Sequence, residues 1–334
     1  MATVLCMIPR NRFRHSDIKI PVELDMHYQI AHKEDEIVRA CKRMEFLLLP
    51  AGSPEITQTI MERISSIRMI QIAGAGFGHV DIRAAAANQI PVCNSPLKNM
   101  NTVAEFTIAQ IITLLRNTVY SDSEIKAGNY SKIRENIFKF GIKEMSDIRI
   151  GLLGFGPIGR QVAKIGRYLG SNIAYCDINR ANKQVEKELK VEFLQFDHLF
   201  AMCDVVSIHL PITETTKKMV GGRELDLMHP ESFLINTSSS EIVDQEALAM
   251  ALETGPIAGA AIDSISPDPP PPNHPLLKLS DRARDRLLIT PHIAGITKAS
   301  FKKLIEGALI NIAQVSHGHE PENAVYRVVK TKSV

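Results

Sequence analysis

The chain has 334 residues and a mass of 37.0 kDa, a length that suggests about two domains. Hydrophobic residues make up 45% and charged residues 23%, as in an ordinary globular protein, and 39 Lys and Arg against 37 Asp and Glu leave a net charge of +2. This balance, the absence of Trp and an aromatic share of 5% argue against a nucleic-acid-binding surface.

The five cysteines predict neither disulfides nor a metal site, because their number is odd and no two stand at CxxC spacing. The N-terminal apolar stretch is too short for a signal peptide, and no run approaches the ~20 apolar residues of a membrane span. We therefore expect a cytoplasmic protein that binds no metal, no membrane and no nucleic acid.

Short continuous apolar runs recur along the chain, each followed by a turn and a helical pattern. Such runs are typical of strands buried on both faces of a parallel sheet. They predict strands over Val4–Ile8, Phe46–Leu49, Met69–Ala73, Ile148–Leu153, Val205–Ile208, Phe233–Ile235, Ile257–Ile262 and Leu287–Ile289. Apolar positions at helical spacing predict helices over Ala104–Leu115, Ile158–Leu169, Gln245–Leu252 and Ser300–Val315. Repeated β–α units of this kind indicate an α/β fold.

Two stretches interrupt this rhythm. Asn117–Asp147 is polar and poorly periodic, so we interpret it as an excursion from the sheet or as a subunit contact. Ser264–Pro275 contains six prolines and lies between two predicted strands. Because proline fixes the backbone, we expect this segment to be a stiff, extended loop of the domain.

The segment from Ile148 to Asp177 carries the pattern of a dinucleotide-binding turn. It reads IRIGLLGFGPIGRQVAKIGRYLGSNIAYCD, which is a strand, a glycine-rich turn, an amphipathic helix and a second strand. Gly154 permits the tight turn, Gly156 lets the backbone approach a pyrophosphate, and Gly159 lets helix and strand pack closely. The helix N-terminus offers free N–H groups to the phosphates. In this context the motif predicts a bound dinucleotide.

Asp177 indicates which dinucleotide is bound. It follows the second strand, 18 positions after Gly159, where a carboxylate accepts hydrogen bonds from the adenosine ribose and repels a 2′-phosphate. This favours NAD over NADP, although the nearby Arg180 leaves some tolerance of NADP open. About 150 residues of the same β–α type precede the motif, so a substrate domain precedes the dinucleotide domain or wraps around it.

Further motifs resemble those of the D-isomer-specific 2-hydroxyacid dehydrogenases, a family that includes D-lactate, D-glycerate, phosphoglycerate and formate dehydrogenases. They follow the family's order from about residue 69 to 296. Besides the GFGPIG turn, the matching segments are IAGAGFGHVD (Ile72–Asp81), NSPLKNMNTVAE (Asn94–Glu105), CDVVSIHLPITETT (Cys203–Thr216), FLINTSSSEIVDQEAL (Phe233–Leu248), IAGAAIDSISPDP (Ile257–Pro269) and LLITPHIAG (Leu287–Gly295).

This resemblance implies an architecture and an assembly. Residues 1–100 and 292–334 would form a flavodoxin-like substrate domain, and residues 101–291 a Rossmann NAD-binding domain, both with parallel sheets. The active site would lie in the cleft between them. Family members usually pair through their NAD domains, so the resemblance implies a homodimer in which the Asn117–Asp147 excursion has a role.

The resemblance also implies ligand-binding positions. Backbone amides of the Ala73–Gly76 turn, which contains Gly74, Ala75 and Gly76, would bind the substrate carboxylate, and Asp263 would hold the nicotinamide carboxamide. Further cofactor contacts would come from Pro157, Ile158, Pro211, Thr237, Ser238, His292, Ile293, Ala294 and Gly295.

His292 occupies the position of the family's catalytic histidine. It would protonate the carbonyl oxygen as hydride arrives in reduction, and take the hydroxyl proton in oxidation. Asp268, five residues after Asp263, stands where the family usually has Glu. It can still hydrogen-bond the imidazole and favour its charged form, although its side chain is one methylene shorter.

Ser239 stands where the family has its catalytic arginine. The family pattern NTARG reads NTSSS here, over residues 236–240. A neutral hydroxyl therefore replaces the guanidinium that normally grips the carboxylate of a 2-oxo acid and polarises its carbonyl. Losing such a charged partner costs on the order of 1.5–3 kcal/mol, roughly 10- to 200-fold in rate. We expect poor reduction of standard 2-oxo acids unless another group compensates.

The first interpretation of this replacement is a redox enzyme whose substrate-binding cation has moved. One candidate is the NSPLKN loop, with Lys98 and Asn99. The other is the basic cluster that follows the first strand, where ligands of open α/β sheets bind. Its members are Arg10, Arg12, Arg14 and His15. On this interpretation the small-molecule substrate is anionic.

Two other interpretations remain open. In one, the enzyme acts on a substrate that has no 2-oxo acid head and is held by Ser238–Ser240 or Glu241, or it uses bound NAD transiently as a lyase or isomerase. In the other, the protein is an NAD(H)-sensing regulatory or binding protein on the same scaffold. Because His292, Asp268 and Asp263 keep their family positions, we favour an NAD-dependent oxidoreductase that acts on CH–OH groups.

Overall fold

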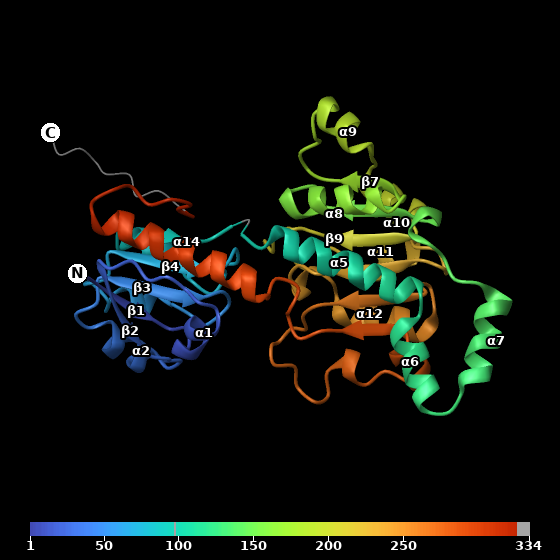
Figure 1. The fold of residues 1–334 in the computed structure, drawn as a ribbon, viewed down its shortest axis with the longest axis horizontal. Coiled ribbons are helices and arrows are strands. Elements are labelled where there is room, and N and C mark those ends of the chain that lie inside the picture. Colours follow the sequence, from blue (N-terminus) through green and yellow to red (C-terminus); the bar gives the residue numbers. More distant parts are fainter. Residues whose placement is uncertain (97, 326–334) are drawn as a thin grey trace. The chain divides into compact units, whose positions relative to one another are not determined.

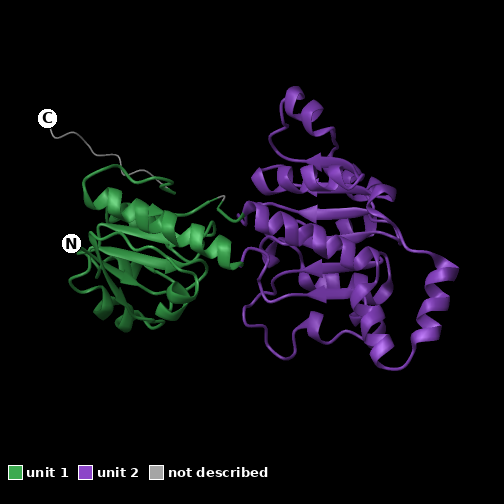
Figure 2. Ribbon diagram, viewed as in Figure 1, with its two compact units in different colours: residues 1–99, 297–334 green, residues 100–296 purple. Residues whose placement is uncertain are grey.

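The computed structural model describes residues 1–96 and 98–325, and the chain forms two compact units (Figures 1 and 2). Unit 1 comprises Met1–Asn99 and Thr297–Val334, and unit 2 comprises Met100–Ile296. The expected return to the first domain at residue 292 lies before the observed return at Thr297. The segment that carries His292 therefore belongs to unit 2.

Unit 1 is built on a five-stranded parallel sheet with strand order β2-β1-β3-β4-β5. This is the flavodoxin-like order, as predicted. The strands are β1 (Ala2–Cys6), β2 (Leu24–Tyr28), β3 (Phe46–Pro50), β4 (Met69–Ala73) and β5 (Val92–Cys93). The helices are α1 (Arg10–His15), α2 (Glu34–Cys41), α3 (Gln58–Met61), α4 (Ile82–Ala87) and, from the far end of the sequence, α14 (Lys298–Ser316).

Alternation along β3 shows how the unit 1 core is made. Phe46 and Leu48 pack with apolar residues of α14, whereas Leu47 and Leu49 pack with those of α2, α3 and α4. Helices therefore cover both faces of the sheet, as Figure 1 shows. This explains why β3 is an uninterrupted apolar run and not an alternating one.

Unit 2 is built on a seven-stranded parallel sheet with strand order β12-β11-β10-β9-β6-β7-β8. The strands are β6 (Arg149–Leu153), β7 (Asn172–Cys176), β8 (Val191–Phe193), β9 (Val205–Ile208), β10 (Phe233–Asn236), β11 (Gly259–Ile262) and β12 (Leu287–Ile289). The helices are α5 (Met100–Leu115), α6 (Thr118–Lys126), α7 (Tyr130–Phe140), α8 (Pro157–Tyr168), α9 (Lys183–Leu189), α10 (Phe196–Met202), α11 (Gly222–Leu227), α12 (Gln245–Thr254) and α13 (Asp281–Arg284). Three short 3₁₀ turns cover Met145–Asp147, Ser240–Ile242 and Pro275–Leu277.

The strand order of unit 2 reverses between β6 and β9, because the chain first builds outward through β7 and β8 and then returns to the other side of β6. This is the doubly wound Rossmann arrangement predicted from the sequence. In such sheets ligands bind beyond the carboxyl ends of the strands at the reversal. The glycine-rich turn follows β6 directly and so lies at this point.

The predicted excursion over Asn117–Asp147 contains no strand and consists mainly of α6 and α7. Helical spacing is not evident there because α6 has no buried residue and α7 buries only Ile133. The Pro-rich segment forms an irregular loop up to the 3₁₀ turn at Pro275. Within residues 1–96 and 98–325, no helix is long and apolar enough to cross a membrane.

Candidate active site and cofactor site

The glycine-rich turn is folded as a dinucleotide cradle. Gly154 has φ +98°, and a Cβ there would lie 2.6 Å from the carbonyl oxygen of His209, so both its conformation and its packing require glycine. A Cβ on Gly159 would collide with the carbonyl oxygen of Gly154, whereas one on Gly156 would meet open space. Gly156 directly precedes α8, whose first residues are Pro157 and Ile158. The turn therefore leaves room for a pyrophosphate at the N-terminus of α8.

Asp177 is tied to this turn. One carboxylate oxygen accepts a hydrogen bond from the Phe155 amide at 2.7 Å, and the other accepts one from the Asn179 amide at 2.9 Å. The half-buried carboxylate is thus fixed beside the cradle, where an adenosine ribose would meet it. The glycines, the helix N-terminus and this carboxylate together fit an NAD molecule.

His209 packs against the cradle from the end of β9. Its Nε2 lies 2.9 Å from the Ser207 hydroxyl, and its side chain also approaches Gly159. Burial lowers the pKa of His209 to about 4, so the ring is neutral at neutral pH. Nearby, the Pro211 carbonyl accepts a hydrogen bond from the Thr216 hydroxyl at 2.7 Å.

Asp263 holds the turn that carries His292. Its carboxylate is 1% exposed and accepts hydrogen bonds from the Thr290 hydroxyl at 2.6 Å, the Ile293 amide at 2.9 Å and the Ala294 amide at 2.7 Å. His292 itself is exposed, and its backbone has φ +55°. A residue other than glycine rarely adopts this backbone conformation without such support. The family resemblance implies a cofactor contact for Asp263, but its role as a positioning residue for His292 is evident only in the fold.

Asp268 lies in the Pro-rich loop and is exposed. Just before it, the backbone of Ser266 is anchored on both sides: its amide donates to the Gln245 side chain at 3.2 Å, and its carbonyl accepts from the Gln245 amide group at 3.0 Å. His274, which is buried, also reaches that carbonyl at 3.2 Å. No hydrogen bond joins Asp268 to His292 among the described residues, so their pairing stays a prediction.

The turn that contains Ser239 is organised by the side chain of Asn236. The Asn236 oxygen accepts hydrogen bonds from the amide and hydroxyl of Ser238 at 3.0 and 2.7 Å, and its nitrogen donates to the Ser239 carbonyl at 3.0 Å. The Thr237 hydroxyl lies 2.9 Å from that of Thr107 on α5. Within the described part of the chain, no Arg or Lys side chain bonds to residues 236–240. The turn that contains Ser239 is therefore held by neutral hydrogen bonds among the described residues.

Glu241, the next residue, forms an ion pair with Lys217 at 3.1 Å. Its carboxylate already has a cationic partner, so nothing in this contact directs it towards a substrate. The structure leaves the suggested substrate contact of Glu241 without a supporting interaction.

The proposed carboxylate-binding turn follows β4 in unit 1. Gly74 lies so close to the preceding loop that a Cβ there would stand 2.6 Å from the Cβ of Ala51. The Gly74 carbonyl accepts from the Ser95 amide at 2.8 Å, and the Ala75 carbonyl accepts from the Asn94 side chain at 2.8 Å. The amides of Ala75 and Gly76 donate to no described residue. They are therefore free to bind an anion.

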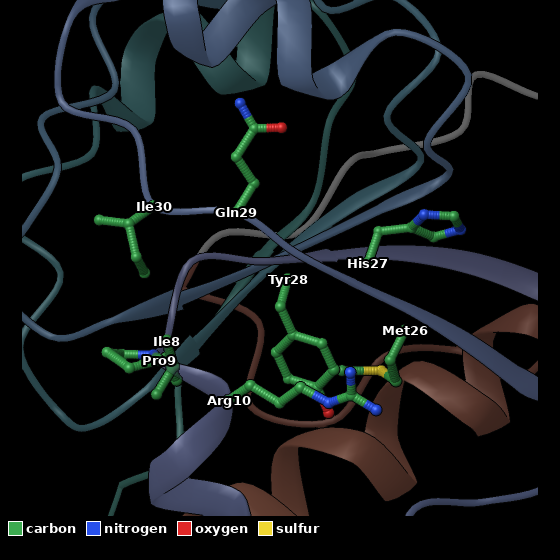
Figure 3. Close-up of a pocket in the computed structure, with 8 residues that line it drawn as sticks. All are labelled: Ile8, Pro9, Arg10, Met26, His27, Tyr28, Gln29 and Ile30. Carbon is green, nitrogen blue, oxygen red and sulfur yellow. The ribbon is translucent and has the colours of Figure 1, made fainter.

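Arg10 lines a cavity of about 480 Å³ at the carboxyl ends of β1 and β2 (Figure 3). Its guanidinium lies 5.5 Å from the ring centre of Tyr28, and Figure 3 shows these two side chains together, with His27 pointing away. Ile8 and Met26 supply apolar lining. No described carboxylate pairs with Arg10, so this cation is available to a ligand.

The other proposed cations are placed differently. The Arg12 guanidinium lies 4.4 Å above the ring centre of Phe301 on α14 and does not line the cavity. The Lys98 side chain ends over Gly307 of α14, where its Nζ would be 3.8 Å from an added Cβ. Asn99 is the last residue of the first segment of unit 1. The structure thus separates Arg10 from the rest of the predicted basic cluster.

The fold and the glycine turn define unit 2 as a Rossmann nucleotide-binding domain. Residues 108–294 match the family model described as "D-isomer specific 2-hydroxyacid dehydrogenase, NAD binding domain". The glyoxylate reductase of Thermofilum pendens is 34% identical over 296 residues, which cover 88% of this chain and 85% of that protein. The D-3-phosphoglycerate dehydrogenase of Escherichia coli K12 is 33% identical over 285 residues, which cover 83% and 66%.

Solved structures agree with this fold. A D-lactate dehydrogenase of Aquifex aeolicus, solved with NAD and lactic acid, has a TM-score of 0.78 and 23% identity, and the match covers 95% of this chain and 96% of that one. The chain therefore belongs to the D-isomer-specific 2-hydroxyacid dehydrogenases, which are NAD-dependent oxidoreductases acting on CH–OH groups.

Proposed function

We propose that this protein interconverts a 2-oxo acid and the corresponding D-2-hydroxy acid, with His292 as the acid–base group and without an arginine at the substrate carboxylate. The observation that carries the proposal is the His292 turn. Buried Asp263 fixes this turn through three hydrogen bonds, and the imidazole remains exposed. A scaffold for binding NAD alone has no need of a histidine presented in this way.

The chain's own residues would divide the work as follows. A cofactor held at the glycine-rich turn would supply a hydride as NADH in reduction and accept one as NAD⁺ in oxidation. His292 gives a proton to the carbonyl oxygen or removes it from the hydroxyl. The free amides of Ala75 and Gly76 bind the substrate carboxylate. Ser239 offers one neutral hydroxyl at the position of the family's arginine.

We propose further that Arg10 supplies the missing positive charge by binding a second anionic group of the substrate. Like Arg12 and Lys98, Arg10 has no carboxylate partner among the described residues, but of these three residues it alone lines the cavity. This favours 2-oxo acids with a carboxylate, phosphate or sulfonate at the far end. Arg10→Ala should raise the apparent KM for such a substrate by about tenfold.

Arg14→Ala is the matched control for Arg10→Ala, because it removes the same charge from the same short helix without touching the cavity. An unchanged KM in Arg10→Ala would refute the relocated cation. An equal rise in both variants would show that only the overall charge matters, which also refutes it.

The catalytic proposal is tested by following NADH absorbance with small, dicarboxylic, phosphorylated and sulfonated 2-oxo acids. The wild type should consume NADH with at least one class. His292→Gln should lower kcat by about 100-fold or more and leave the Kd of NADH nearly unchanged, because its loss removes proton transfer. NADH binding without turnover of any 2-oxo acid, and without oxidation of the hydroxy acids by NAD⁺, would refute the proposal.

We also propose that the protein is a homodimer that pairs through α6 and α7. Phe138 and Phe140 on α7 are 75% and 76% exposed, and Val119, Ile125 and Tyr130 add further exposed apolar surface. Such a surface is costly in a monomer.

For the location of the protein we propose the cytoplasm, because its five cysteines are free thiols, of which four are buried.

A further inference from the structure

The loop that follows Asp177 forms an ion pair with α9. Arg180 is three residues further on, and its guanidinium is bound in a bidentate manner by Glu186 of α9, with Nε and Nη2 at 2.8 and 3.1 Å from the two carboxylate oxygens. The same guanidinium lies 4.9 Å from the ring centre of Phe193. Both contacts draw the positive charge of Arg180 towards α9 and β8.

Glu186 is itself held in place. The hydroxyl of Tyr175, a fully buried residue of β7, donates to a Glu186 oxygen at 2.7 Å and accepts from the Ala181 amide at 3.0 Å. The Glu186 side chain is only 13% exposed, although it is charged. The Arg180 guanidinium, and next the Tyr175 hydroxyl, lower the pKa of Glu186, so it is ionised at neutral pH.

The Tyr175 ring connects this contact to the cofactor cradle. It stacks on Phe155 of the glycine-rich turn, with centroids 4.1 Å apart and planes at 23°, and meets Phe193 edge-on at 5.5 Å. Phe155 is also the residue whose amide binds Asp177. The charged contact of Arg180 is therefore built into the wall of the proposed adenosine site and is not an isolated surface ion pair.

We propose that Glu186 is a specificity-determining residue that restricts the protein to NAD by withholding Arg180 from the 2′-phosphate of NADP. In Rossmann domains an arginine near the ribose accommodates this phosphate, whereas an acidic residue favours the free hydroxyl. This chain has both an acidic residue, Asp177, and an arginine, Arg180, in the loop between β7 and α9. Asp177 repels the phosphate, and Glu186 occupies the guanidinium that would otherwise bind it. The inference rests on the proposed adenosine site.

The experiment measures the Kd of NADH and of NADPH by fluorescence titration, which needs no substrate. The central variant is Glu186→Gln, which retains an oxygen to accept from Tyr175 but removes the charge that holds Arg180. We expect its Kd for NADPH to fall by about tenfold, because the released guanidinium can form a charge-assisted hydrogen bond with the 2′-phosphate. Its Kd for NADH should change by less than about twofold, because NADH carries no such phosphate.

Two further variants distinguish the loss of the Arg180–Glu186 contact from a general change in charge. Glu188→Gln removes the same charge from the same helix, at a residue that accepts a hydrogen bond from the Gln184 side chain and has none with Arg180. It should leave the Kd of NADPH within about twofold of wild type. In Glu186→Gln/Arg180→Ala the improved binding of NADPH should disappear, because the released cation is absent.

An unchanged Kd of NADPH in Glu186→Gln would overturn the inference. So would an equal improvement in Glu188→Gln, or an improvement that survives in the double variant. If the wild type bound neither NADH nor NADPH, the proposed cofactor site would fail first. That result differs from normal NADH binding with no effect of Glu186, which contradicts the specificity role alone.

Discussion

Replacing Asp263 with Asn tests whether one buried carboxylate holds the turn that carries His292. The carboxylate accepts three hydrogen bonds, two at one oxygen and one at the other. An Asn side chain has a single acceptor oxygen, so at best it keeps two of them. The third donor, the amide of Ala294 at a site 2% exposed, then faces an NH₂ group without an acceptor. A lost hydrogen bond to a charged group costs about 1.5–3 kcal/mol, and the remaining two weaken because the acceptor is neutral.

We therefore expect Asp263→Asn to lower the free energy of unfolding, measured by urea denaturation, by about 3 kcal/mol. Turnover should fall as well, because the φ +55° conformation of His292 loses its support. Asp268→Asn is the control: Asp268 is exposed and has no hydrogen bond among the described residues, so its unfolding free energy should change by less than ~0.5 kcal/mol. An Asp263→Asn protein as stable and as active as wild type would refute this account of the turn.

Three further predictions concern packing, pH and assembly. Gly74→Ala should destabilise unit 1 by about 1–3 kcal/mol in urea denaturation and raise the KM of the substrate, because the new Cβ would stand 2.6 Å from the Cβ of Ala51. Adding Ala51→Gly should reverse most of both effects in the same assays. His209 stays neutral in the folded protein down to about pH 4, whereas the unfolded chain takes up its proton near pH 6.5, so lowering the pH favours unfolding. Between pH 8 and pH 5 this group should remove about 2 kcal/mol of stability, and equal urea midpoints at the two values would contradict its burial in the neutral form. Phe138→Glu/Phe140→Glu should convert the proposed dimer into monomers in sedimentation velocity, while a lasting dimer would exclude α7 from the interface.

The sequence predicts the central strands of both sheets well and also the edge strand β12, whereas it misses the edge strands β2, β5 and β8. Central strands such as β3 and β9 are buried on both faces, so an unbroken apolar run marks them. β2 alternates between buried and exposed residues, and β5 has only two residues, so neither produces such a run. The two helices of the 117–147 excursion bury almost nothing within the chain and leave no helical pattern for the same reason.

At the candidate site, the sequence indicates residue types at family positions but not their contacts. The glycine turn is recognisable because backbone conformation and close packing require glycine there, and Asp177 is recognisable because an acidic residue follows the second strand at the expected spacing. The support of His292 by Asp263 joins residues 29 positions apart, and only the fold brings them together. Likewise, nothing in the spacing separates Arg10, which lines a cavity, from Arg12, which lies on Phe301. The contact between Arg180 and Glu186 is not predictable from the sequence, because surface charges on a short helix are normally solvated.

The measurement that tests the central claim most directly compares wild type with Ser239→Arg, by NADH absorbance, on glyoxylate and on 2-oxo acids with a second anionic group. The wild type should turn over a doubly anionic acid with a higher kcat/KM than glyoxylate. Ser239→Arg should gain about tenfold or more on glyoxylate, because a guanidinium would grip its single carboxylate. If neither protein oxidised NADH with any of these acids while both bound it, the claim that this chain is a 2-hydroxyacid dehydrogenase with a relocated substrate anchor would be contradicted.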